Sequence, residues 1–155
     1  MQLQVPASVT MFLRKTELRD TTNNYIVVHN DGNNLNARTT HLTLRIRRLS
    51  YHFFISRNGT LYQFMNLKYI AKHAGISKYA GYDNWNDFSI GICLQGTNET
   101  PYTEKQYKTL NRLMKYLHAR YPDSNNKSIL GHSDIAFPYG RKTDPGLFFD
   151  RAKIN

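Results

Sequence analysis

"NYIVVHN", residues 24–30, is a short apolar run that is rich in β-branched side chains and has a histidine near its end. Such a run predicts a buried β-strand. The run "FSIGICLQG" (88–96) has the same character and predicts a second buried strand. Buried strands need other elements to cover them, so helices and further strands are expected around them.

Two stretches have the periodicity of helices. "ARTTHLTLRIRRLS" (37–50) has basic residues between apolar residues at helical spacing. These apolar residues are Leu42, Ile46 and Leu49. In "TEKQYKTLNRLMKYLHARY" (103–121), Thr103 and Gln106 have the spacing of a capping box, which predicts the start of the helix. Its predicted apolar face consists of Tyr107, Leu110, Leu113, Met114 and Leu117.

The segment "YHFFISRNGTLYQFM" (51–65) contains two β-rich runs around Asn58-Gly59, a pair that favours a hairpin turn. The other expected segments are a polar lead-in (1–23), a loop (66–87), a short strand (127–131) and a terminal helix (147–154). Strands and helices alternate along the chain. The sequence therefore predicts an α/β fold in a single domain over 1–155, with a central mixed sheet flanked by helices.

Composition limits the class of protein. The chain has 155 residues, of which 40% are hydrophobic and 13% aromatic, enough to bury the core of one domain. No apolar run approaches the ~20 residues that span a bilayer. The start, "MQLQVPASVTMFLRKTEL", shows no secretory signal, so synthesis in the cytoplasm is expected. The single Cys93 excludes an intramolecular disulfide and a zinc site made of several thiolates.

The charge of the chain favours a polyanionic partner. The net charge is +10, from 21 Lys and Arg against 11 Asp and Glu. Nucleic acid, an anionic membrane and an acidic cell-wall matrix all fit this charge, as does a basic surface that only maintains solubility. No nucleic-acid-binding motif is recognisable, so a nucleic-acid partner is not expected.

Three polar residues are candidate metal ligands. His29 and His132 each lie at the end of a predicted strand, where α/β sheets tend to place ligand sites. Asp144 follows in the Gly/Pro-rich stretch "GHSDIAFPYGRKTDPG" (131–146). Two imidazoles and one carboxylate form a common catalytic zinc shell that leaves a fourth position open. On spacing alone, ordinary polar residues at strand ends remain the alternative.

Five stretches together carry a resemblance to a known family. They are "YIVVHN" (25–30), "YHFFISRNGTLYQ" (51–63), "AKHAGIS" (71–77), "NDFSIGICLQGT" (86–97) and "GHSDIA…GRKTDPG" (131–146). In this order they resemble zinc-dependent N-acetylmuramoyl-L-alanine amidases, a family that includes phage amidase-lysozymes, bacterial cytosolic anhydromuramyl-peptide amidases and animal peptidoglycan recognition proteins. The resemblance implies the peptidoglycan-recognition (type-2 amidase) fold. It also implies hydrolysis of the amide bond between N-acetylmuramic acid and L-alanine.

The resemblance assigns roles to single residues. It implies that a zinc ion is bound by His29, His132 and Asp144. Lys142 matches the family's catalytic lysine, and Tyr51 matches the tyrosine that phage amidases keep near the zinc. His73 falls in a block that resembles part of the substrate groove; a loop histidine without a role is the alternative.

One position departs from part of the family. The cytosolic enzymes carry a catalytic glutamate where this chain has Cys93. The phage enzymes also lack that glutamate, although the loop "GRKTDPG" (140–146) is more similar to the cytosolic enzymes. We therefore expect a monomeric phage-type endolysin acting on peptidoglycan. The alternatives are a cytosolic amidase that recycles muropeptides and a non-catalytic peptidoglycan-binding module.

Overall fold

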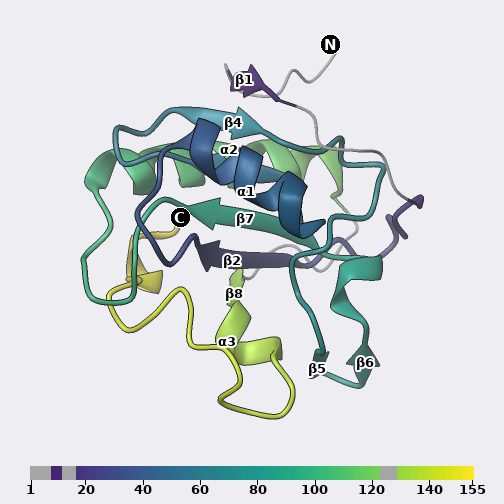
Figure 1. Cartoon of the computed structure of the whole chain (residues 1–155). Helices are drawn as coiled ribbons and strands as arrows, with labels where there is room; N and C mark the ends of the chain where they lie inside the picture. The colour runs from purple at the N-terminus through teal and green to yellow at the C-terminus, as the bar shows by residue number, and fades with distance from the viewer. Residues whose placement is uncertain (1–7, 12–16, 123–128) are drawn as a thin grey trace.

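A mixed sheet lies at the centre of the protein, whose computed structural model describes residues 8–11, 17–122 and 129–155 (Figure 1). In their order across the sheet, the strands are β1 (Ser8–Thr10), β4 (Leu61–Gln63), β3 (Phe53–Ile55), β7 (Ile90–Leu94), β2 (Ile26–Asn30) and β8 (Ile129–Gly131). Strands β3 and β4 pair antiparallel, which confirms the hairpin, and the other neighbouring strands in this sheet pair parallel. The predicted α/β class is confirmed.

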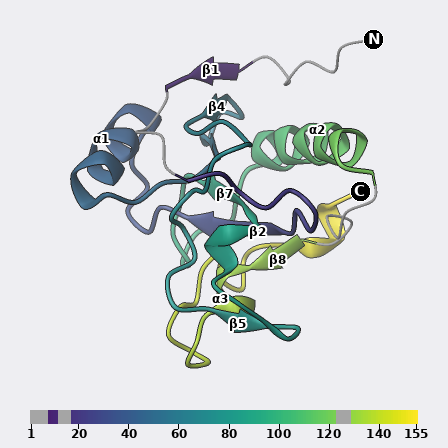
Figure 2. The ribbon, with the colours of Figure 1, turned by 90° about the vertical axis from the view of Figure 1, so that its right-hand side faces the viewer.

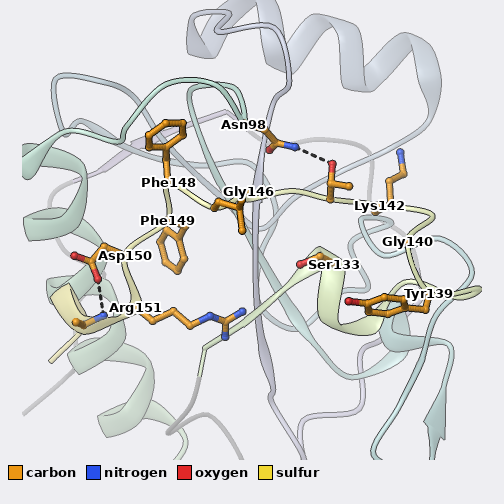
Figure 3. Close-up of a pocket in the computed structure, with 13 residues that line it drawn as sticks. Asn98, Ser133, Tyr139, Gly140, Lys142, Gly146, Phe148, Phe149, Asp150 and Arg151 are labelled. Atoms are coloured by element: carbon orange, nitrogen blue, oxygen red, sulfur yellow. Dashed lines mark hydrogen bonds between the residues drawn. The ribbon is translucent and has the colours of Figure 1, made fainter.

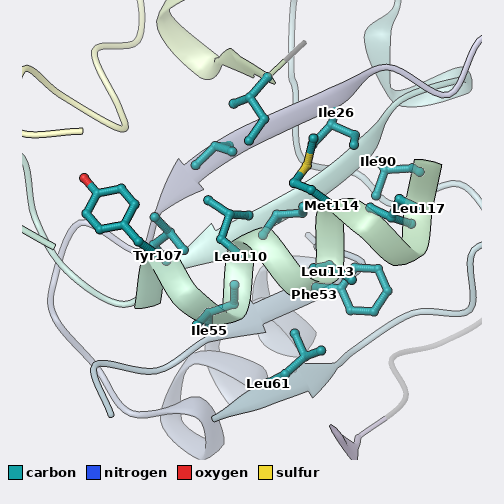
Figure 4. Close-up of a cluster of buried hydrophobic side chains, with 14 of the residues drawn as sticks. Ile26, Phe53, Ile55, Leu61, Ile90, Tyr107, Leu110, Leu113, Met114 and Leu117 are labelled. Atoms are coloured by element: carbon teal, nitrogen blue, oxygen red, sulfur yellow. The ribbon is translucent and has the colours of Figure 1, made fainter. Parts of the chain in front are cut away.

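Helix α2 (Glu104–Arg120) covers one face of the sheet (Figures 2 and 4). Its capping box is present as predicted, because Thr103 and Gln106 each accept a hydrogen bond from the other's backbone N–H. The buried side chains between helix and sheet include Ile26, Val28, Phe53, Ile55, Ile90, Ile92, Leu110, Leu113 and Met114. Alternate residues of a strand point to opposite faces, so His29 on β2 and Cys93 on β7 point away from α2.

Helix α1 (Ala37–Arg47) lies over the opposite face (Figure 2). The helix is confirmed, but the prediction of its apolar face is wrong. The predicted residues are exposed: Leu42 by 48%, Ile46 by 84% and Leu49 by 38%. Ala37 and Leu44 are buried instead and pack against the sheet. The reason is charge: at 100° per residue, Arg45 falls in the same stripe as Leu42 and Ile46, and burying it there would desolvate an unpaired guanidinium.

The two ends of the chain differ from the predictions. Residues 1–23, expected as a lead-in, contribute strand β1 at the edge of the sheet, where it pairs with β4. The prediction of a terminal helix is wrong, since only the short 3₁₀ turn η2 (Arg151–Lys153) is helical in 147–154. Here Phe149 is buried in the core while Leu147 is fully exposed, so the apolar residues do not form one helical face.

The remaining segments need smaller corrections. The expected loop 66–87 contains β5 (Lys78–Tyr79), β6 (Tyr82–Asp83) and the 3₁₀ turn η1 (Trp85–Asp87). Within the expected strand 127–131, Ile129–Gly131 form β8, and residues 127 and 128 lie outside the described residues. Across the described segments, no helix is both long enough and apolar enough to cross a membrane.

Candidate metal centre

Two histidines and one aspartate meet at the carboxyl edge of the sheet. His29 lies near the end of β2, His132 begins α3 (His132–Ile135) directly after β8, and Asp144 lies in the following loop. The Nδ1 atoms of the two histidines are 3.1 Å apart and lie 3.2 Å and 3.1 Å from carboxylate oxygens of Asp144. One ligand atom from each residue lies within 4.8 Å of the others, close enough for a single metal ion. We call these three residues the His-His-Asp cluster.

The sheet topology brings the cluster together. Strands β2 and β8 are parallel neighbours, and their paired residues end just before His29 and His132, so both histidines emerge at the same edge. The carbonyl of Asp144 accepts a hydrogen bond from the backbone N–H of Ser133 at 3.0 Å, which holds its loop against α3. Residues 103 positions apart in sequence thus become neighbours.

Side chains also fasten the loop that carries Asp144. The Asn98 Nδ2 donates to Oγ1 of Thr143 at 2.8 Å (Figure 3). The Oδ1 of Asn98 accepts a hydrogen bond of 2.7 Å from Nδ2 of Asn30, which lies at the end of β2. The loop is therefore connected to the strand that carries His29.

Burial sets the protonation of the cluster. It lowers the pKa of His29 to about 4, so this imidazole is neutral at pH 7 and available as a ligand. Burial would raise the pKa of Asp144, but its close contacts with the rings of His132 and His29 outweigh burial and hold that pKa well below its usual range. At neutral pH the site therefore offers a neutral imidazole beside a carboxylate.

The hydrogen bonding of His132 fits a metal ligand. Its Nε2 lies 2.9 Å from the carbonyl oxygen of Ala74, which can only accept, so in the neutral ring the hydrogen is on Nε2 and Nδ1 keeps a lone pair. This lone pair faces His29 and the carboxylate of Asp144, an arrangement that a cation between them would stabilise. Two imidazoles and a carboxylate match a catalytic zinc donor set. The residues present fit the zinc ion that the sequence predicts.

An open cavity of about 500 Å³ lies beside the cluster. Its lining includes Tyr51, His73, His132, Lys142 and Asp144. The ring of Tyr51 lies 5.0 Å from that of His29, centroid to centroid. The side chain of Lys142 is exposed and also lines a second cavity, of about 870 Å³, along the same loop (Figure 3). The expected catalytic residues thus border the cavity that the cluster faces.

His73 lies behind His29. It is only 7% exposed, and its Nδ1 is 2.8 Å from Nε2 of His29. Burial lowers the pKa of His73 well below its ordinary value. The positive charges that His29, His52 and His132 would carry lower that pKa further. Its polar contacts are with the interior rather than with the open part of the cavity. The substrate-binding role expected for it remains a prediction.

Cys93 stands on the same face of the sheet as the cluster. It pairs with His29 across β7 and β2 and is fully buried, as expected for a core residue. Burial raises the pKa of the Cys93 thiol well above its usual value, and burial also raises the pKa of Tyr51. Both groups are neutral at pH 7, so neither supplies an anionic base.

Two residues of the cavity were not assigned a role from the sequence. The Asn86 side chain accepts hydrogen bonds from the backbone N–H groups of His73 and Ala74 at 2.9 Å and 2.7 Å. Arg141 donates to the carbonyls of Ala74 and Ile76 at 2.9 Å and 2.8 Å. Both hold the segment "AKHAGIS" in place, and the only signal in the sequence that could have found them is that each lies in a stretch that carries the family resemblance.

Fold and site together define a class: α/β proteins with a His-His-Asp donor set beside an open cavity, as zinc hydrolases have. The chain belongs to the N-acetylmuramoyl-L-alanine amidase family, which it matches over residues 19–147. The family resemblance inferred from the five sequence blocks is confirmed.

Known proteins give a more detailed comparison. The 1,6-anhydro-N-acetylmuramyl-L-alanine amidase AmpD of Haemophilus influenzae is 44% identical over 103 residues, which are 66% of this chain and 55% of that protein. A crystal structure of selenomethionine AmpD matches with a TM-score of 0.76 at 30% identity, over 100% of both chains. The endolysin amidase LysCS from Clostridium intestinale also has a TM-score of 0.76, at 24% identity over 98% of this chain and 95% of that one, which shows the fold alone. The chain spans about half the length of the curated relatives it matches.

Proposed function

We propose that the protein is a zinc-dependent hydrolase that cleaves the amide bond between N-acetylmuramic acid and L-alanine. The observation that carries this proposal is the His-His-Asp cluster beside an open cavity, in a chain of the amidase family. The candidate ligands and both candidate catalytic side chains come from one chain, so the site needs no residue of a second subunit; a monomeric enzyme remains a prediction.

The residues around the cluster have the chemistry that amide hydrolysis needs. A zinc ion in such a shell lowers the pKa of a coordinated water to about 7 and polarises a carbonyl. Lys142 lines the same cavity as Asp144, and its ammonium group can stabilise negative charge that develops on the scissile carbonyl oxygen. Tyr51 keeps its phenolic hydrogen because burial raises its pKa, so it can orient water or donate a proton to the leaving amine.

The charge of the cavity fits an anionic substrate. Its lining contains the cations Arg47, Lys72, Arg141 and Lys142 and the carboxylates Asp31 and Asp144. Peptidoglycan stem peptides carry carboxylates, so the cationic rim and the net charge of +10 would attract them over a distance. Salt should weaken this attraction.

The comparisons favour a soluble 1,6-anhydromuramyl peptide as the substrate. The name of the relative that is 44% identical, 1,6-anhydro-N-acetylmuramyl-L-alanine amidase, contains that anhydromuramyl group. The likeness to the endolysin extends only to the fold. The expected endolysin role is therefore less well supported than its alternative, a cytosolic amidase of cell-wall recycling. Synthesis in the cytoplasm remains a prediction.

One observation favours intact wall as a second candidate substrate. Cys93 lies on the face of the sheet that carries the cluster. By the family resemblance, cytosolic enzymes carry a catalytic glutamate at this position, and phage enzymes do not. The cysteine therefore favours a phage-type endolysin, whose substrate is the intact wall.

The experiment compares purified sacculi with anhydromuramyl peptides and measures the release of new L-alanine N-termini, with zinc and with a chelator. We expect zinc-dependent turnover, faster on the anhydromuramyl peptides. Asp144→Ala should lose bound zinc and turnover together. The control Asp20→Ala removes an exposed carboxylate that accepts hydrogen bonds from Thr22 and is not part of the cluster, and it should keep both zinc and turnover. A zinc-loaded protein that binds sacculi but cleaves neither substrate would be a non-catalytic module and would contradict the proposal.

A further inference from the structure

His73 makes two side-chain hydrogen bonds in the interior. Its Nδ1 lies 2.8 Å from Nε2 of His29, and its Nε2 lies 3.0 Å from Oγ of Ser89. The rings of the two histidines are nearly perpendicular, at 89°, with centroids 4.9 Å apart. His73 therefore connects a candidate metal ligand to a buried hydroxyl.

The hydroxyl of Ser89 gives this chain of hydrogen bonds a direction. It donates to the carbonyl of Trp85, which can only accept. Ser89 has no second hydrogen, so its Oγ accepts the Nε2–H of His73. A neutral His73 then has a lone pair on Nδ1, and it accepts the Nε2–H of His29. The Nδ1 of His29, which faces the rest of the cluster, keeps its lone pair.

We propose that His73 is a positioning residue for the metal: together with Ser89 it holds His29 in the tautomer whose Nδ1 is free to bind zinc. The next residue acts in the same way on the other imidazole, because the carbonyl of Ala74 accepts the Nε2–H of His132. One short segment, 73–74, thus orients both histidines of the cluster. Contacts of this kind to the second ring nitrogen fix the orientation of metal-binding histidines.

The surroundings of His73 are shaped to keep it in place. A Cβ atom on Gly91 of β7 would lie 2.6 Å from Cγ of His73, so only glycine leaves room for the ring. The side chain of Asn86 accepts the backbone N–H groups of both His73 and Ala74. The ring is therefore restrained from the sheet and from the backbone of its own segment.

This inference rests on the metal site of the proposed function and not on its substrate. Its readouts are zinc affinity and the position of a hydrogen on His29. A protein with both properties that cleaves neither substrate would refute the proposed function and leave this inference standing.

The first test measures the zinc dissociation constant of the full chain by competition with a fluorescent chelator. His73→Leu removes the acceptor and should weaken zinc binding by about 10- to 100-fold. His73→Asn should restore most of the affinity, because its Oδ1 can take the place of Nδ1. The matched control is His41→Leu, which removes a buried histidine that packs on Phe64 instead, and it should leave zinc affinity unchanged.

The second test uses NMR of zinc-loaded protein with ¹⁵N-labelled histidine. The ring of His29 should carry a slowly exchanging hydrogen on Nε2, and exchange should become fast in His73→Leu. If that variant does not fold, Ser89→Ala replaces it and should weaken zinc binding and speed the same exchange.

Three results would overturn the inference. The first is unchanged zinc affinity in His73→Leu, or in Ser89→Ala where the leucine variant does not fold. The second is a His73→Asn variant that binds zinc as weakly as His73→Leu. The third is the absence of a hydrogen on Nε2 of His29.

Discussion

Acid should destabilise the metal-free protein through a histidine that folding keeps neutral. His52 is fully buried, its Nδ1 accepts from the backbone N–H of Gly91 at 3.1 Å, and its Nε2–H donates to the carbonyl of Tyr69 at 2.9 Å. Burial, and then the positive charge of Arg19, lowers the pKa of His52 to about 3. Both ring nitrogens are satisfied in the neutral form, so protonation would break the bond from Gly91.

The pKa values give the size and sign of the effect. In the unfolded chain the ring takes up a proton near pH 6.5, whereas in the folded protein it stays neutral down to about pH 3. Between these values the unfolded state binds the extra proton, so the free energy of unfolding falls as the pH falls. Below pH 6.5 each pH unit costs about 1.4 kcal/mol, and above it the cost is small, so the total between pH 7 and pH 5 is about 2 kcal/mol. The buried His29 and His73, whose pKa values are also lowered, act in the same direction.

Urea denaturation in the presence of a chelator, at pH 7 and pH 5, measures this effect in the parent protein and in His52→Asn. Asparagine keeps an acceptor for Gly91 but does not titrate. The variant should therefore lose about 2 kcal/mol less than the parent over this range. Equal losses in the two proteins would refute the reasoning. If the variant does not fold, NMR titration of the parent decides, since protonation of the His52 ring above pH 5 would refute it as well.

Three further predictions concern the site and the core. Lys142→Ala should keep bound zinc and lower kcat by about 10², the low end for loss of a charge-stabilising group because this lysine is exposed. The control Lys115→Ala, on the far side of α2, should keep full activity; equal kcat values would remove Lys142 from the mechanism. Cys93→Ser should leave kcat almost unchanged, and a large loss at unchanged stability would assign the thiol a role in catalysis. Leu113→Ala should lower the free energy of unfolding by about 2 to 5 kcal/mol in urea denaturation, because its side chain is fully buried between α2 and the sheet. A loss below about 1 kcal/mol would show that α2 is not packed on the sheet as described.

Elements whose signals are local were predictable. Strands β2 and β7 are continuous apolar runs, and the hairpin turns at an Asn-Gly pair. Two features of the sequence predict helix α2: the capping box at Thr103 and one uninterrupted apolar face. In each case the residues that determine the element lie within one or two turns of each other, so no distant contact is needed to decide the outcome.

Elements that depend on their packing partners could not be predicted from the sequence. Helix α1 has two possible faces at helical spacing, and only the position of the sheet and of Arg45 decides which one is buried. In 147–154, the core takes Phe149 and leaves Leu147 in solvent, which prevents a helix with a single apolar face. Strand β1 forms because β4 offers it an edge, and nothing in its own three residues predicts this.

The sequence by itself determined the family, the α/β class, and the residue types of the cluster with two histidines at strand ends. Only the tertiary structure decided that Asp144 reaches both histidines, and that Ser89 and His73 stand behind His29. Strand ends are visible in a sequence because burial and backbone geometry repeat over a few residues. Which side chains then meet depends on parallel pairing of β2 with β8 and on the path of the loop, and these involve residues far apart in the chain.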